Sequence, residues 1–161
     1  MRRFLGIITV LIMCFAIFIP CLRASCSITG STSWSGVSGD EWTCTAATRA
    51  ETASAISSAS SGDKINLSAG SETWSSELTV PANKALWING AGKSGNPTGT
   101  TINGNSFDLT NYGTEMVRIS GFYFNQCQPN TDQVVGDRVI IIDNNTIYNT
   151  GNYDWYFHGY D

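Results

Sequence analysis

Residues 61–92 alternate short apolar runs with polar corners, and this pattern sets the expectation for the rest of the chain. Three runs have the composition and length of strands, namely Lys64–Leu67, Glu77–Val80 and Ala85–Ile88. The gaps between them contain Gly, Ser, Pro or Asn and are too short for a crossover helix. The pattern predicts short strands in a chain that coils forward rather than folding back on itself.

One helix is predicted just before this stretch, from about Thr48 to Ser61. Thr48 and Glu51 have the spacing of a capping box, and Gly62 supplies a residue suited to a helix stop. Small apolar residues follow at helical spacing: Ala50, Ala53, Ile56 and Ala59. We expect a short helix that lies as a cap against the end of another element.

Later segments repeat the motif of a hydrophobic strand that ends in a polar corner. The three versions are residues 85–90, 116–121 and 139–144. Ile119 and Ile142 lie 23 residues apart, an interval typical of one turn of a β-solenoid. The interval from Ile88 to Ile119 is longer, so we expect a loop to bulge out around Gly92–Gly99.

The spaced motifs resemble those of the pectin-lyase-like right-handed parallel β-helix superfamily. They are A-I-x2-A-x2-G-D-K-I-x-L-x-A-G ending at Gly70, then T-W-S-S-x-L-T-V, L-W-I-N-G-A-G, V-R-I-S-G-F-x-F and I-D-N-N-T-I-Y-N. The resemblance runs from Cys44 to about Gly151. It implies an all-β fold, a right-handed parallel β-helix (solenoid) with a short N-terminal capping α-helix.

The same resemblance sets the functional expectation. The superfamily contains polysaccharide lyases, glycoside hydrolases and non-catalytic surface proteins, so the fold alone does not choose among them. We expect a protein that acts on or binds extracellular polysaccharide, as a lyase or a glycoside hydrolase if it is an enzyme. The alternative is a non-catalytic cell-surface or adhesion protein.

The first residues have the pattern of a secretory signal peptide. Arg2 and Arg3 precede the uncharged run Phe4–Pro20, and small residues follow. A retained membrane anchor is the alternative interpretation. We therefore divide the chain into a signal peptide at 1–25, an N-terminal arm at 26–47, and a capping helix with the first coils at 48–161. We also expect the chain to be the N-terminal portion of a longer protein, secreted or at the cell surface.

The charge pattern narrows the class of partner. The sequence has 13 acidic and 9 basic residues, and three of the arginines belong to the leader. The mature chain is therefore acidic and has no basic stripe, which argues against nucleic acid and against anionic membrane surfaces as partners. Extracellular polysaccharide remains the expected partner.

Three cysteines follow the leader: Cys26, Cys44 and Cys127. Export permits disulfides, and a Cys26–Cys44 bridge would staple the N-terminal arm and leave Cys127 unpaired. The alternative is that all three are free thiols. With one His and no C-x-x-C pair, a cysteine-based metal site is disfavoured.

The arm at residues 27–42 is rich in Ser, Gly and Thr, and it is predicted to be irregular. Trp34 and Trp42 are its large apolar groups. We expect them to pack against the domain, with carbohydrate stacking as the alternative.

Candidate catalytic groups are few. Asp137, Asp143 and Asp154 are the acidic candidates for Ca2+ binding, and Arg118 and Arg138 are the candidate bases. Ca2+ is implied by the family resemblance if the protein is a lyase, and no other cofactor is evident. The motifs W-x-D-H and R-x-P-x-x-R do not occur. We expect Asp143 to be a corner residue and Arg118 to face solvent, and we assign no catalytic residue.

The last ten residues, 152–161, are densely aromatic and include His158, the single histidine. They could form a sugar-stacking subsite, but the favoured interpretation is that they begin another coil and bury their rings. A lone His with no evident partner is not taken as catalytic.

Overall fold

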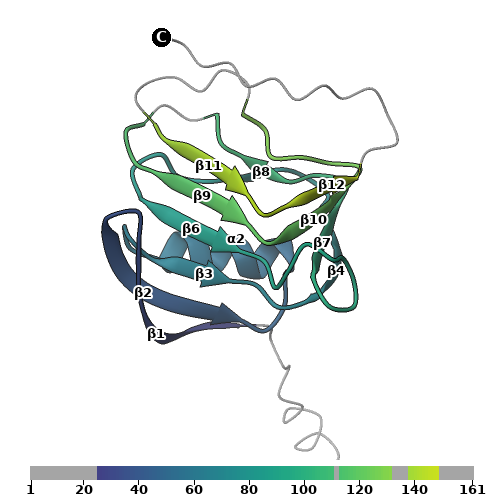
Figure 1. Ribbon diagram of the computed structural model, residues 1–161, viewed down its shortest axis with the longest axis horizontal. Coiled ribbons are helices and arrows are strands. Elements are labelled where there is room, and N and C mark those ends of the chain that lie inside the picture. The colour runs from purple at the N-terminus through teal and green to yellow at the C-terminus, as the bar shows by residue number, and fades with distance from the viewer. Residues whose placement is uncertain (1–24, 111–112, 132–137, 149–161) are drawn as a thin grey trace, which may run out of the picture.

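The computed structural model describes residues 25–110, 113–131 and 138–148, and in them the chain forms three sheets and one helix (Figure 1). The six-stranded sheet contains, in order, β1 (Cys26–Trp34), β2 (Val37–Cys44), β3 (Lys64–Asn66), β6 (Leu86–Asn89), β9 (Val117–Ser120) and β11 (Ile140–Asp143). The four-stranded sheet contains β12 (Thr146–Tyr148), β10 (Phe122–Asn125), β7 (Thr100–Asn103) and β4 (Gly70–Thr73). The two-stranded sheet contains β5 (Leu78–Thr79) and β8 (Phe107–Asp108).

The prediction of a right-handed parallel β-helix is wrong. The strands form three sheets rather than a single solenoid, and the six-stranded sheet is of mixed direction. In that sheet β1 and β2 pair antiparallel, whereas β2, β3, β6, β9 and β11 pair parallel. The chain is rich in strands, with a single short helix among the described residues. The predicted all-β class therefore agrees roughly with the structure, but the predicted β-helix architecture does not.

The antiparallel pair also corrects the prediction for the arm, which is a hairpin rather than an irregular segment. Ser35 and Gly36 have φ of 46° and 83°, which is the backbone of a tight two-residue turn between antiparallel strands. Thr, Val and Trp in the flanking runs favour extended backbone. The Ser and Gly content that suggested a loop is compatible with the hairpin because most of β1 is exposed.

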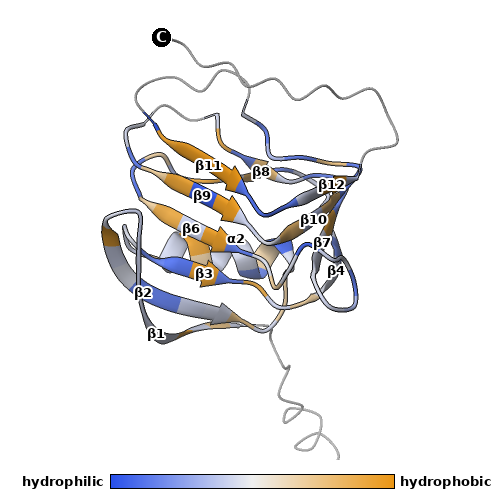
Figure 2. Ribbon diagram, in the orientation of Figure 1, coloured by the Kyte–Doolittle hydropathy of each residue, from blue (hydrophilic) through white to orange (hydrophobic). Residues whose placement is uncertain are grey.

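The core is built from residues that stack in register from strand to strand. Ile65 pairs with Ile88, Ile88 with Ile119, and Ile119 with Ile142. Figure 2 shows the resulting hydrophobic bands along β6, β9 and β11. Aromatic rings fill the space between the sheets, at centroid distances of 5.1 Å for Trp74–Phe107 and 5.6 Å for Phe107–Phe122.

Helix α2 (Arg49–Ser58) lies behind the six-stranded sheet in the view of Figure 1. Thr48 is its N-cap and accepts a hydrogen bond from the Glu51 backbone N–H at 3.2 Å. The Glu51 carboxylate does not accept the Thr48 backbone N–H, as it would in a complete capping box. Instead it accepts the backbone N–H groups of Thr45 at 2.8 Å and Ala46 at 3.3 Å, which fixes the chain that enters the helix.

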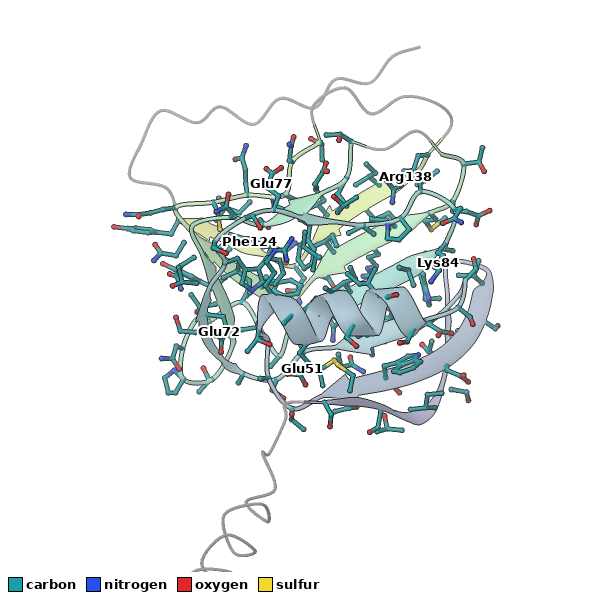
Figure 3. The ribbon with its side chains drawn as sticks, turned by 180° about the vertical axis from the view of Figure 1, so that it is seen from behind. Glu51, Glu72, Glu77, Lys84, Phe124 and Arg138 are labelled. Carbon is teal, nitrogen blue, oxygen red and sulfur yellow. A yellow bond between two sulfur atoms is a disulfide. The ribbon has the colours of Figure 1, made fainter. Side chains whose placement is uncertain are left out.

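The helix ends three residues before the predicted Ser61, and its C-cap is Ala59 rather than a glycine. The last carbonyl groups are satisfied by a side chain from outside the helix. Lys84 Nζ donates to the carbonyl oxygens of Ser57 at 3.0 Å and Ala59 at 2.6 Å, and Figure 3 shows Lys84 close to this end of the helix. A cation at a helix C-terminus also interacts favourably with the helix dipole.

A disulfide joins Cys26 to Cys44 across the open end of the β1–β2 hairpin. Figure 3 shows it beside α2, near Glu51. Cys127 is a buried free thiol, and burial raises its pKa to about 11. The thiolate is therefore scarce at neutral pH, which makes Cys127 a poor nucleophile. Within the described ranges, no helix is long and apolar enough to cross a membrane.

Replacing both bridged cysteines, Cys26→Ala with Cys44→Ala, should lower the free energy of unfolding by about 3 kcal/mol. The bridge closes a loop with a sequence separation of 18 residues, and removing it releases entropy of that order in the unfolded chain. Equilibrium urea unfolding under non-reducing conditions measures the change. The matched control, Ser33→Ala with Ser38→Ala, alters an exposed facing pair of the same hairpin and should change stability little. Equal losses in the two double variants would contradict the prediction.

Candidate functional site

The outward residues of the six-stranded sheet form a row that we call the charged ladder: Glu41, Lys64, Trp87, Arg118 and Asp143. The first four occupy successive register positions on β2, β3, β6 and β9. Lys64 Nζ lies 3.0 Å from Glu41 Oε1, and Arg118 donates to both carboxylate oxygens of Asp143, at 3.0 and 2.5 Å. The two cations lie over the Trp87 ring, 4.4 and 4.5 Å from its centroid.

A chain of hydrogen bonds links the polar residues of the same face. Trp87 Nε1 donates to Ser120 Oγ at 2.7 Å, and Ser120 Oγ donates to Asn89 Oδ1 at 3.0 Å. Asn89 Nδ2 donates to Asn66 Oδ1 at 3.0 Å, and Asn66 Nδ2 donates to Glu41 Oε1 at 2.8 Å. The charges of the ladder are thus neutralised within it, so its main effect is to hold neighbouring strands together.

The pKa shifts of the charged ladder have the direction that these contacts dictate. The hydrogen bond from Lys64, followed by that from Asn66, lowers the pKa of Glu41 below its ordinary value. The hydrogen bonds to Asp143 raise the pKa of Arg118. Both groups stay ionised at neutral pH, so neither is suited to exchanging protons with a substrate.

The outward residues of the four-stranded sheet form a different surface, which we call the Tyr–amide face: Asn103, Tyr123, Asn125, Thr146 and Tyr148. The rings of Tyr123 and Tyr148 are nearly parallel, with an interplanar angle of 22° and centroids 6.3 Å apart. Tyr148 is 51% exposed, which is unusual for a large aromatic side chain. Asn125 Nδ2 donates to Asn103 Oδ1 at 2.7 Å, which continues the row of polar groups along the face.

A long loop borders the Tyr–amide face. Residues Gly90–Gly99 connect β6 to β7, where the long repeat interval predicted a bulge. The Asn96 N–H donates to Thr101 Oγ1 at 3.0 Å, which ties the loop to β7. Gly95 has φ of +76°, and a Cβ at this position would lie 3.6 Å from the Tyr123 ring. The loop therefore supports Tyr123 from one side.

The structure separates the two arginines that the sequence offered as bases. Asp143 ends β11 just before the corner at Asn144, but its carboxylate binds Arg118 of the neighbouring strand, and Arg118, although partly exposed, is ion-paired. Arg138 is buried and donates to the carbonyl oxygens of Leu109 at 3.2 Å and Pro81 at 3.0 Å. Burial lowers the pKa of Arg138, although the charge of Asp108 opposes this effect.

The remaining predicted acidic and aromatic candidates, Asp137, Asp154, His158 and the segment 152–161, lie outside the described residues. For the ranges that the structure describes, the one group of three potential metal ligands is Cys26, Cys44 and Glu51. The two sulfurs of this group are bonded to each other, so they cannot act as thiolate ligands. Because Asp137 and Asp154 lie outside the described residues, the three-Asp arrangement considered for Ca2+ stays a prediction.

The two tryptophans of the hairpin pack against the domain. Trp34 is buried beside Trp87, and its Nε1 donates to the Gly62 carbonyl at 2.9 Å. Trp42 Nε1 donates to Asp63 Oδ2 at 2.8 Å. Neither indole is presented as a platform for a sugar.

Sequence reasoning did not single out Tyr123 and Tyr148 as functional residues. The available signal was the pattern Phe122-Tyr123-Phe124, in which a strand with period two buries both phenylalanines and turns the tyrosine outward. Tyr148 follows in the next repeat but pairs with Asn125, two residues further along the partner strand. The contact between Tyr148 and Tyr123 could therefore be predicted only with knowledge of the register between β10 and β12.

No protein-family model matches the chain, and no curated protein or solved structure is significantly similar to it. The resemblance to the pectin-lyase-like superfamily stays a prediction from the quoted motifs. Functional residues must therefore be argued from the geometry of this chain.

The substitution Lys64→Met should raise the pKa of Glu41 toward its ordinary value, because it removes the strongest hydrogen bond to that carboxylate. A carboxyl group whose pKa is lower in the folded than in the unfolded protein stabilises the fold at pH values above its unfolded-state pKa, about 4.3. This contribution is lost as the pH falls through the folded-state pKa. An NMR titration of the Glu41 side-chain carboxyl measures the shift. The control Lys93→Met, in the loop bordering the other sheet, should leave the Glu41 pKa unchanged. An unaltered Glu41 pKa in Lys64→Met would show that the ion pair does not form in solution.

Proposed function

We propose that the protein binds an extracellular polysaccharide on the Tyr–amide face without cleaving it. The observation that carries this proposal is the exposed ring of Tyr148, nearly parallel to the half-buried ring of Tyr123, beside a row of side-chain amides. Binding of this kind suits a secreted protein and equally a cell-surface or adhesion protein.

The chemistry of the face matches that of a sugar chain. A tyrosine ring offers a large apolar surface for the C–H face of a pyranose and a hydroxyl for its polar rim. Each asparagine amide has two N–H donors and a carbonyl acceptor, so Asn103 and Asn125 retain hydrogen-bonding capacity beyond the bond that joins them. Thr146 lies on β12 in register with Tyr123 and adds a hydroxyl group to the same face.

Two buried or half-buried carboxylates, Asp63 and Asp108, have structural tasks, which favours binding over cleavage. Asp63 accepts hydrogen bonds from the Asp40 backbone N–H at 2.8 Å and the Ser60 backbone N–H at 2.9 Å. Asp108 accepts from Thr79 Oγ1 at 3.1 Å and Thr110 Oγ1 at 2.6 Å. A glycoside hydrolase requires two carboxyl groups that face the scissile bond, one of them free to transfer a proton.

Export of the protein is part of the proposal. The N-terminal pattern of a signal peptide supports it, and so does the disulfide, because such bonds persist in oxidising compartments outside the cytosol.

Tyr148→Ala should weaken binding to a polysaccharide ligand by about fivefold, since the stacking of an aromatic ring contributes roughly 1 kcal/mol. Affinity electrophoresis against a panel of plant, algal and microbial polysaccharides identifies the ligand and measures the loss. Tyr148→Phe retains the ring and should keep most of the affinity.

Two further readouts make this test decisive. Ile28→Ala removes an exposed apolar side chain from β1, the edge strand of the six-stranded sheet, and should leave binding unchanged. The mixtures should contain no new reducing or unsaturated ends. Retention of full affinity in Tyr148→Ala, or release of such ends, would contradict the proposal.

A further inference from the structure

We infer that the ligand of the Tyr–amide face is a neutral polysaccharide rather than a polymer of uronic acids. This inference rests on the proposed function and specifies its substrate class. It follows from where the charged side chains of the described residues lie and what they contact.

The outward positions of the four-stranded sheet are uncharged on every strand. They are occupied by hydroxyl, amide and phenol side chains: Ser71, Thr73, Thr101, Asn103, Tyr123, Asn125, Thr146 and Tyr148. Thr101 is buried beneath the Gly90–Gly99 loop. The charged residue within these strands is Glu72, which pairs in register with the buried Ile102 and is partly exposed. Because side chains alternate along a strand, Glu72 points to the opposite side from Ser71 and Thr73, so the outward row itself carries no charge.

The cations elsewhere on the described surface are engaged. Lys64 and Arg118 are bound to carboxylates within the charged ladder. Arg49 donates to the Glu77 carbonyl at 2.7 Å, and Lys84 donates to the end of α2. Recruiting any of them to a uronate would break contacts that hold the fold, which costs more than the new ion pair returns at an exposed site.

Lys93 is the one cation close in sequence to the Tyr–amide face. It is exposed in the Gly90–Gly99 loop. A single exposed lysine contributes little to the binding of a polymer that carries one negative charge per sugar, and salt screens that contribution further. A neutral chain loses no charge solvation when it contacts rings and amides, so the face favours it.

Isothermal titration calorimetry of the full chain distinguishes the two substrate classes. The probes are hexasaccharides of β-linked glucose and β-linked mannose, compared with hexamers of galacturonate and mannuronate. We expect a neutral hexamer to bind at least about tenfold more tightly than either acidic one. Its Kd should change by less than about twofold between low salt and about 0.5 M NaCl, because no ion pair is formed. Tyr148→Ala should weaken this binding, and Lys93→Met should not.

The outcomes separate this inference from the proposed function. Binding of an acidic hexamer that equals or exceeds neutral binding, and that salt or Lys93→Met weakens, would overturn the neutral class while leaving polysaccharide binding in place. Binding of none of the four hexamers, together with no retardation by any polysaccharide of the wider panel, would overturn both.

Discussion

The parallel register between neighbouring strands is the constraint on which the rest of the structure depends. Because each buried isoleucine of the six-stranded sheet lies on the next, every strand must present the same face inward. The outward positions are then aligned as well. Their side chains form continuous rows across the sheet, whatever residue types occupy them. One constraint therefore creates both the core and the two polar faces, and a slip of one residue would exchange them.

The two faces use this alignment differently. On the six-stranded sheet, opposite charges and an indole alternate along the row, so the strands bind one another through side chains as well as through the backbone. On the four-stranded sheet, the rings of Tyr123 and Tyr148 stack and two amides join, and Tyr148 remains exposed. The charged ladder and the face proposed for binding thus lie on separate walls of the same core, so a substitution on one wall need not disturb the other.

The sequence allowed local features to be predicted better than their assembly. Thr48 acts as the helix N-cap because its hydroxyl and the Glu51 amide are three residues apart, and Ile119 pairs with Ile142 because equal intervals bring equal positions together. The hairpin was missed because Ser35 and Gly36 determine it, while the flanking Ser and Thr residues are equally common in loops. The Arg118–Asp143 pair and the Tyr123–Tyr148 stack join residues 25 positions apart, so they depended on a register that composition does not specify.

The corners between the six-stranded and four-stranded sheets differ greatly in length although they connect the same two walls. Gly121 alone makes one of them, with φ of +77°, and a Cβ there would lie 2.5 Å from the Gly90 carbonyl oxygen. At the preceding repeat, residues Gly90–Gly99 make the same crossing. The ladders on either side are in register in both cases, so the fold tolerates added chain at this edge. New segments could be acquired here during evolution, or inserted by design, immediately beside the tyrosines and without repacking the core.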